Sequence, residues 1–248
     1  MTDRHVWILG ATSAIAHAYA RRRAELGASL LLFGRNEVHL RANAADLLAR
    51  GAKAASVRCC DLARPLDYDA MLANLMASEG PADEVLIAYG ILEQRGRSAG
   101  DVAYARDVIE TNFTSVVCWL LAIIARWDRG RPLTLIVIGS VAGDRGRGSN
   151  FVYGAAKGGL DRFLEGLQHA FAGTKLRVVR IKPGFVDTPM TAHLVKGGFL
   201  WAMPDRIAAD IERAADRGRA VVYSPWFWWP LMMIIRHLPR FIFHRLKI

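Results

Sequence analysis

The sequence predicts an α/β fold with a single doubly wound, parallel sheet of about seven strands. Short apolar segments alternate along the chain with longer segments of helical pattern, at the spacing of β-strand–helix–β-strand units. The short segments are apolar throughout, as expected for strands that are covered by helices on both faces. The length of 248 residues suits one domain of this kind.

The first half of the chain contains four of the expected strands. The first strand is a short apolar run that ends at Gly10, and a segment of helical length and pattern follows it. In order, we expect a strand at 5–9, a helix at 13–26, a strand at 29–33, a helix at 37–50, a strand at 54–59, a helix at 68–78 and a strand at 84–88.

The second half continues the alternation, with longer helices. In order, we expect a long helix at 104–127, a strand at 133–138, a helix at 151–171, a strand at 176–181, a helix at 204–216 and a strand at 220–223. The segment 143–149, which contains glycines and arginines, is expected to be a flexible loop directly before the helix at 151–171.

Composition and charge exclude several classes of protein. The three cysteines are an odd number without metal-ligand spacing, so we expect no disulfide framework and no metal site, and infer a reducing compartment. Residues 1–9 contain no long apolar run, so no secretory signal is expected there. The formal net charge is +10. No nucleic-acid motif accompanies the basic residues, however, so we expect no nucleic-acid partner.

A tyrosine and a lysine four residues apart are the strongest functional signal. Tyr153 and Lys157 are separated by about one helical turn, so both side chains project from one face of the predicted helix. A phenol titrates near ~10, and a neighbouring ammonium is expected to lower its pKa. Ser140 lies before them in the chain and could hold a substrate oxygen against the phenol. Such a set of groups can move a proton on or off a carbonyl or alcohol oxygen.

The turn between the first strand and the first helix fits a dinucleotide phosphate site. Gly10 allows a tight turn, and Thr12, Ser13 and Ile15 lie where the helix begins. Backbone N–H groups and the helix dipole at such a position suit a pyrophosphate. Alanines stand at positions 14 and 16, where a full fingerprint has glycines. An ordinary strand–turn–helix unit is therefore an equally good interpretation of this segment by itself.

The ends of the next three strands extend this interpretation to a nicotinamide dinucleotide. Arg35 stands where an acid would bind the ribose hydroxyls of NAD, so NADP(H) is favoured and NAD(H) is possible. Arg35 could instead stack on adenine or lie in solvent. Asp61 and Leu62 could receive the adenine amino group, or Asp61 could cap a helix. The loop Ala88-Tyr89-Gly90 would let the backbone approach a ribose.

Together these pieces resemble the short-chain dehydrogenase/reductase family, whose fold is Rossmann-like. The matching residues occur in the family's order over nearly the whole chain: Gly10, Asp61, Ala88-Tyr89-Gly90, Asn112, Ser140, Tyr153-x-x-x-Lys157, Pro183-Gly184 and Thr188. The chain departs from the family pattern at Ala14 and Ala16, and at Tyr89, where the family often has a second alanine.

The resemblance implies a role for each of these residues. Tyr153 would be the general acid in reduction and the base in oxidation, while Lys157 would lower its pKa and bind the nicotinamide ribose. Ser140 would orient the substrate carbonyl, and Asn112 would hold a water that links Lys157 to solvent. The residues beside the nicotinamide carboxamide would be Pro183, Gly184, Val186 and Thr188.

Four further segments resemble one branch of that family. They are AGDR at 142–145, NFVYG at 150–154, MTAHL at 190–194 and RHLPRFIF at 236–243. Members of the branch reduce a 2-keto-pentose carried on decaprenyl phosphate, after a flavin oxidase has formed the ketone, and so supply arabinose donors for cell walls. The likeness implies a lipid-linked keto-sugar substrate and a flavin oxidase partner. The branch's usual donor is NADH, which leaves the choice of cofactor open.

A Trp-rich, basic tail at 225–248 follows the dinucleotide-binding catalytic domain at 1–224. Its apolar run at 225–235 is shorter than the ~20 residues that span a bilayer, and Arg236, Arg240, Arg245 and Lys247 follow it. We expect an amphipathic tail that lies on a membrane surface, with the protein cytoplasmic and peripheral on the inner membrane face. Packing across subunits of a homo-oligomer is the alternative.

Three functions follow from the sequence. The first is NAD(P)H-dependent reduction of a keto group on a polyprenyl-phosphate-linked sugar. The second is the same chemistry on another lipid, acyl or steroid-like ketone, with the apolar tail forming the pocket. The third is a non-catalytic nucleotide-binding scaffold, which the complete set of Ser140, Tyr153 and Lys157 disfavours.

Overall fold

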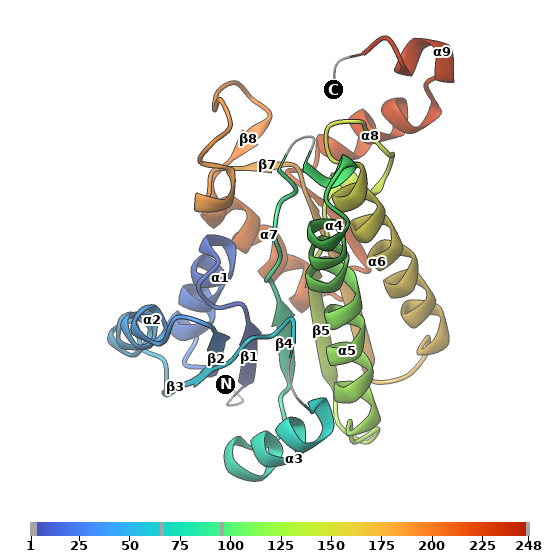
Figure 1. Cartoon of the computed structure of the whole chain (residues 1–248). Helices are drawn as coiled ribbons and strands as arrows, with labels where there is room; N and C mark the ends of the chain where they lie inside the picture. The colour runs from blue at the N-terminus through green and yellow to red at the C-terminus, as the bar shows by residue number, and fades with distance from the viewer. Residues whose placement is uncertain (1–3, 65–66, 95–96, 247–248) are drawn as a thin grey trace.

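The computed structural model describes residues 4–64, 67–94 and 97–246 and arranges them around a seven-stranded sheet. The strand order is β3-β2-β1-β4-β5-β6-β9, and every neighbouring pair is parallel. Helices cover both faces of the sheet (Figure 1). The predicted fold class, a doubly wound parallel sheet, is confirmed.

The elements follow the predicted order closely. The sheet strands are β1 (His5–Leu9), β2 (Ser29–Gly34), β3 (Ala54–Cys59), β4 (Glu84–Ile87), β5 (Leu133–Ile138), β6 (Leu176–Pro183) and β9 (Val221–Ser224). The helices are α1 (Ala14–Glu25), α2 (Glu37–Ala49), α3 (Tyr68–Glu79), α4 (Val102–Ile109), α5 (Ser115–Ala125), α6 (Phe151–Ala170), α7 (Pro204–Arg217), α8 (Trp228–His237) and α9 (Arg240–Phe243). A short parallel pair that the sequence did not predict, β7 (Phe185–Val186) and β8 (Trp201–Ala202), lies between β6 and α7.

Strand β1 shows how the apolar strands build two separate cores. Val6 and Ile8 are buried in a cluster with residues of α1, α2 and α7, whereas Trp7 and Leu9 are buried in a cluster with residues of α3, α5 and α6. Successive side chains of a strand point to opposite faces, so an uninterrupted apolar run supplies both clusters. The burial pattern explains why the strands of this chain do not alternate with polar residues.

The expected long helix at 104–127 is interrupted in the structure. Helix α4 ends at Ile109, a π-helical turn covers Glu110–Thr114, and α5 continues from Ser115. Within the described chain, Val102–Ala125 is the one helical stretch long and apolar enough to cross a membrane. Trp119 and Leu120 of this stretch are buried against the sheet, whereas Val102, Ile109 and Leu121 are exposed.

The strand order reverses beside β1, and the carboxyl ends of all seven strands lie at the same edge of the sheet. Strands β2 and β4 lie on either side of β1, and the chain segments that leave them turn away to opposite faces of the sheet. Open α/β sheets bind their ligands at such a reversal, outside the carboxyl ends of the strands. The predicted site residues lie in the segments that follow β1 to β6, apart from Pro183, which is the last residue of β6.

The tail at 225–246 lies at the end of the molecule where α6 begins (Figure 1). Trp228 and Met232 of α8 are buried in a cluster with Val141, which follows the strand β5 that leads to Ser140. The first part of the tail therefore belongs to the core around the predicted catalytic residues and is not a detached segment. Lys247, one of the basic residues in the membrane prediction, lies outside the described residues.

Candidate active site

Tyr153 and Lys157 lie on the buried face of α6, one turn apart. The Lys157 ammonium is 6.0 Å from the centroid of the Tyr153 ring, and the side chains are close, as their spacing predicts. Lys157 is only 5% exposed. Its Nζ donates a hydrogen bond of 3.0 Å to the carbonyl of Ile138, at the end of β5. The lysine therefore joins the helix that carries the phenol to the strand that leads to Ser140.

Ser140 reaches Tyr153 because the chain after β5 packs tightly on α6. A methyl group on Gly143 would lie 2.8 Å from the carbonyl carbon of Lys157, so the glycine allows the contact between the two segments. The Ser140 hydroxyl accepts a hydrogen bond of 3.1 Å from the backbone of Ala142 and is hydrogen-bonded to the Tyr153 phenol. The three predicted catalytic side chains are thus brought together.

The electrostatics of this group differ from the expectation in one respect. Burial raises the pKa of the Tyr153 phenol, while the hydrogen bond from Ser140 and the positive charge of Arg147 lower it. Burial also lowers the pKa of Lys157 to about 8. The predicted lowering of the Tyr153 pKa by Lys157 is not found, because the lysine points at the Ile138 carbonyl and Ser140 and Arg147 are the groups that act on the phenol.

Arg147 and Glu93 belong to this site but were not predicted from the sequence. Arg147 lies in the loop before α6, and its charge acts on Tyr153. Glu93, buried in the segment after β4, accepts a 2.8 Å hydrogen bond from the Tyr153 backbone N–H at the start of α6. Its other carboxylate oxygen is buried without a partner in the described chain. The arginines at 145 and 147, directly before the tyrosine helix, were the feature of the sequence from which Arg147 could have been predicted.

Asn112 lies in the π-helical turn between α4 and α5 and is fully buried. Its Nδ2 donates to the carbonyls of Ile91 and Val108, both at 2.9 Å, and its Oδ1 accepts from the Ile91 N–H at 3.2 Å. A methyl group on Gly90 would come within 2.6 Å of Oδ1. The asparagine therefore clamps the loop after β4 beside Lys157. π-Bulges inside helices often occur at functional sites.

The nucleotide end of the site, defined by Gly10 to Ile15, is shaped by backbone. Gly10 has a φ of +92°, and a methyl group on it would lie 2.7 Å from the Tyr89 nitrogen. Ser13 is the N-cap of α1, but within the described chain its side chain makes no capping hydrogen bond. The side chains of Asn36 and Asp67, by contrast, cap α2 and α3. The first N–H groups of α1 are thus available to an anion such as a pyrophosphate. Thr12 is exposed and Ile15 is buried.

The other residues predicted to bind the nucleotide differ in whether they are exposed or already make hydrogen bonds within the protein. Arg35 is exposed at the carboxyl end of β2, where a 2′-phosphate would be recognised. Asp61 accepts a 3.0 Å hydrogen bond from Ala63 N–H, so it caps a turn in this structure. The Leu62 carbonyl accepts from Trp119 at 2.9 Å. Adenine binding by Asp61 and Leu62 remains a prediction.

The loop after β4 and the segment after β6 frame the centre of the site. Ala88 is buried, its N–H donates to the Leu9 carbonyl at 2.9 Å, and the Tyr89 hydroxyl is 3.0 Å from Ser115 Oγ. Pro183, the last residue of β6, and Val186 are buried, and Thr188 is the N-cap of a short 3₁₀ turn. The predicted residues of the nicotinamide loop therefore lie on the same edge as Ser140.

Gly184 connects this loop to the tail. A methyl group on Gly184 would lie 1.9 Å from the indole of Trp228, so the indole occupies the space beside the glycine. Arg145 makes a second connection, because its guanidinium donates to the Ile235 carbonyl and lies 3.7 Å above the Phe243 ring. We use the term substrate end for the segments 141–150, 184–203 and 225–246. The tail is part of this end of the site.

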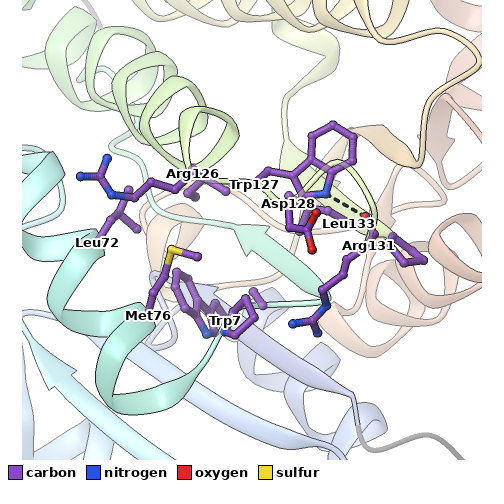
Figure 2. Close-up of a pocket in the computed structure, with 12 residues that line it drawn as sticks. Trp7, Leu72, Met76, Arg126, Trp127, Asp128, Arg131 and Leu133 are labelled. Carbon is purple, nitrogen blue, oxygen red and sulfur yellow. Dashed lines mark hydrogen bonds between the residues drawn. The ribbon is translucent and has the colours of Figure 1, made fainter.

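A pocket at the opposite edge of the sheet contains none of the predicted site residues. It opens between α3 and the end of α5, against Trp7 and Leu133, and Figure 2 shows Trp127 and Arg131 on its rim. The Trp127 indole donates a 2.8 Å hydrogen bond to the Arg131 carbonyl. Because ligands of open α/β sheets bind at the carboxyl edge, we place the candidate site at that edge and not in this pocket.

Comparison with known proteins agrees with this arrangement. Residues 4–197 match the family model described as short chain dehydrogenase. An uncharacterised oxidoreductase of Mycobacterium tuberculosis is 37% identical over 241 residues, which cover 97% of this chain and 96% of that protein. An uncharacterised oxidoreductase of Streptomyces coelicolor is also 37% identical, over 99% of this chain and 96% of its own. The 3-oxoacyl-[acyl-carrier-protein] reductase of Escherichia coli is 29% identical over 87% of both chains.

Two solved structures share the fold. A short-chain dehydrogenase from Sphingobium yanoikuyae, in complex with NADPH, has a TM-score of 0.82 and 23% identity and covers 96% of this chain and 97% of its own. An actinorhodin polyketide ketoreductase variant with NADPH has a TM-score of 0.78 and 23% identity over 89% of this chain and 95% of its own. At this identity the likeness concerns the fold alone.

Proposed function

The chain belongs to the short-chain dehydrogenase family of oxidoreductases, and we propose that it uses NADPH to reduce a keto group on a polyprenyl-phosphate-linked sugar. The observation that carries the reductase part of this proposal is the cluster of Ser140, Tyr153 and Lys157 at the carboxyl edge of the sheet. Tyr153 and Lys157 are buried on α6, Lys157 is bonded to the end of β5, and Ser140 follows β5, so these groups are held in one geometry before substrate arrives, as positioning catalysis requires.

Tyr153 and Ser140 would act on the carbonyl oxygen. Tyr153 donates its phenolic proton to that oxygen, and the Ser140 hydroxyl holds the oxygen against the phenol by a hydrogen bond. Lys157, one helical turn from the phenol, donates to the Ile138 carbonyl and so holds α6 against β5 in the geometry that this proton transfer needs. When bound, NADPH supplies the hydride that completes the reduction. Asn112 holds the loop after β4 in place beside Lys157.

The residues at the nucleotide end fit NADPH. The open N-terminus of α1 suits the pyrophosphate, and the exposed Arg35 suits the 2′-phosphate, because its planar guanidinium can bind a phosphate through two N–H groups. The chain has no acid at this position to bind the ribose hydroxyls of NADH. We therefore propose NADP(H) as the favoured cofactor and NAD(H) as the alternative.

Two observations support a lipid-linked substrate. The tail packs against the substrate end of the site through Trp228 and Arg145, and it carries an exposed apolar surface. Trp226, Trp229, Ile234 and Phe241 are each more than half exposed. Arg236, Arg240 and Arg245 lie among them. We propose that this surface rests on the cytoplasmic face of the inner membrane, where a polyprenyl phosphate and a flavin oxidase that forms the ketone would be within reach.

Reduction of another hydrophobic ketone is the second candidate. It is favoured by the similarity to the Escherichia coli 3-oxoacyl-[acyl-carrier-protein] reductase, whose name states an acyl substrate. In that case the exposed apolar residues of the tail would line the entrance for an acyl or steroid-like chain. A homo-oligomer in which the tail contacts a second copy is compatible with either substrate.

Replacing Tyr153 by phenylalanine tests the reductase proposal. We expect kcat for NADPH-dependent ketone reduction to fall by about 10²–10⁴-fold, the usual contribution of a positioned proton donor. Binding of NADPH, measured by fluorescence titration, should change little. Tyr68→Phe is the matched control, since Tyr68 packs against Trp119 away from the cluster. Full turnover by Tyr153→Phe would exclude the proposed acid, and NADPH binding without reduction of any ketone by the wild type would favour a scaffold.

Serine substitutions of exposed tail residues test the membrane proposal better than a deletion, because deletion would also remove the buried Trp228. The variant Trp226→Ser, Trp229→Ser, Ile234→Ser, Phe241→Ser should lose binding to phosphatidylglycerol vesicles in a sedimentation assay. The control, Val38→Ser with Val102→Ser, removes exposed apolar side chains from α2 and α4. Equal partition of wild type and tail variant would contradict the membrane proposal.

A further inference from the structure

Arg147 acts on the proposed acid, Tyr153, but its side chain has no partner among the described residues. Its carbonyl accepts a 3.3 Å hydrogen bond from Asn150 N–H, the N-cap of α6, so the turn that contains it leads directly into the tyrosine helix. The side chain is half-buried, and its charge acts on the Tyr153 phenol. Within the described residues, the guanidinium makes neither an ion pair nor a hydrogen bond.

Other buried or partly buried arginines of the described chain have partners. Arg23 pairs with Glu84 at 2.9 Å and Arg180 with Asp161 at 3.1 Å. Arg145, in the same loop as Arg147, donates to the Ile235 carbonyl and lies on the Phe243 ring. Withdrawing a cation from water without a partner is unfavourable. A half-buried arginine that lacks one, next to a reaction centre, therefore indicates that a ligand supplies the anion.

The carboxylates of Asp144 and Glu93, in the same part of the site, bind other groups. Asp144 pairs with Lys182 and accepts a 2.8 Å hydrogen bond from the Tyr223 hydroxyl. Glu93 accepts the hydrogen bond from the backbone N–H of Tyr153. Of the two arginines in this loop, Arg147 is therefore the one whose guanidinium has no hydrogen-bond or ion-pair partner among the described residues, and its charge acts on the phenol. A guanidinium matches the oxygens of a phosphate through paired N–H donors.

We propose that Arg147 binds a phosphate ester carried by the ketone substrate close to the reacting carbonyl. The inference rests on the proposed reductase function and narrows its substrate class to ketones with a phosphate group a few bonds from the carbonyl carbon. A sugar linked to a polyprenyl phosphate belongs to this class when the ketone is on the carbon next to the linkage. Simple aliphatic and steroid-like ketones do not.

A matched pair of ketones tests the proposal: hydroxyacetone phosphate and uncharged hydroxyacetone, each reduced with NADPH. Arg147→Met should lower kcat/KM for the phosphate ester by roughly 10- to 100-fold, the range for a lost charge-assisted hydrogen bond. For the uncharged ketone we expect a change of less than about threefold, and Arg147→Lys should recover part of the loss. Arg129→Met, which removes an exposed arginine before β5, is the control for net charge.

Calorimetry separates a failure of this inference from a failure of the proposed function. Propane-1,2-diol 1-phosphate, the alcohol product, is titrated into the complex of the protein with NADP⁺, which requires no turnover. Binding by the wild type that weakens at least tenfold in Arg147→Met supports the inference, even if neither ketone is reduced.

Two outcomes overturn it. An equal loss on both ketones with unchanged product binding would mean that Arg147 only adjusts the acidity of Tyr153. A thermal destabilisation of Arg147→Met that Glu93→Gln reverses would mean that the arginine balances the free oxygen of Glu93.

Discussion

Gly10 lies at the nucleotide end of the candidate site and Gly184 at the substrate end. A methyl group would fit on neither glycine, but the atoms that would clash with it differ. At Gly10 the obstacle is the backbone nitrogen of Tyr89, 2.7 Å away, and the φ of +92° is itself unfavourable for other residues. At Gly184 the obstacle is the indole of Trp228, 1.9 Å away, from a helix far along the chain. The nucleotide end is thus shaped by backbone, and the substrate end by a side chain of the tail.

The two ends therefore differ in what a sequence must supply to form them. A backbone cradle for a pyrophosphate needs a glycine turn and an open helix end, which many sequences share. The substrate end, with Trp228, Arg145 and Arg147, depends on side chains that can change without altering the sheet. Substrate selection is therefore expected to be a property of the loop at 143–149 and the tail.

The largest effect should come from Gly10→Ala. Left-handed backbone costs a non-glycine residue roughly 1–2 kcal/mol, and overlap with Tyr89 adds roughly 1–3 kcal/mol. We expect the free energy of unfolding to fall by about 2–5 kcal/mol in urea titrations. Gly27→Ala separates the two contributions, because Gly27 has a φ of +77° with no described atom within 4 Å of the added methyl. Similar losses at both positions would contradict the role given to Tyr89.

The second effect concerns Lys157, which lies between the two ends. Its pKa is lowered from 10.5 to about 8 by burial, so the unfolded chain binds its proton more tightly than the folded one. Between these pH values the stability of the wild type should rise with pH, by about 3 kcal/mol in all. The measurement is the unfolding free energy of the wild type minus that of Lys157→Met. A difference that is constant from pH 7 to 11 would show that the lysine is not desolvated.

Gly184→Ala should break the substrate end and spare the nucleotide end. Displacing Trp228 should lower the unfolding free energy by roughly 1–3 kcal/mol and expose the indole, which shifts tryptophan fluorescence to longer wavelength. Affinity for NADPH should fall less than in Gly10→Ala. The control is Gly166→Ala in α6, where no described atom lies within 4 Å and the change should be neutral or stabilising by up to about 1 kcal/mol. Retention of a buried indole would argue against the contact.

The smallest effect is expected from Arg35→Ala, which removes a side chain from the backbone-shaped end. Kd for NADPH should rise roughly tenfold or somewhat more, as for one charge-assisted contact, while Kd for NADH stays unchanged. Fluorescence titration with both nucleotides measures this. Arg41→Ala, which removes an exposed arginine paired with Glu37 on α2, controls for charge. Equal weakening of both nucleotides would point to stacking on adenine.

Sequence pattern predicted the sheet well because its signals are local. The apolar runs that became β1, β2, β4, β5 and β6 indicate burial on both faces, and a spacing of four residues places Tyr153 and Lys157 on one face of any helix. The helix expected at 104–127 is interrupted at Asn112; a π-turn leaves the hydrophobic content unchanged, so the pattern alone predicts a continuous helix. The pKa of Tyr153 was misjudged because spacing does not show where a lysine points, and here it points at the Ile138 carbonyl.

By itself, the sequence determined the fold class, the order of the elements and the residues that can move a proton, because backbone preference and side-chain period act over a few residues. Only the tertiary structure decided that Trp228 fills the space beside Gly184, that Glu93 caps the tyrosine helix, and that Arg147 stands unpaired near the phenol within the described chain. These facts depend on contacts between segments far apart in the chain, whose partners are selected by packing and desolvation and leave no periodic trace in the sequence.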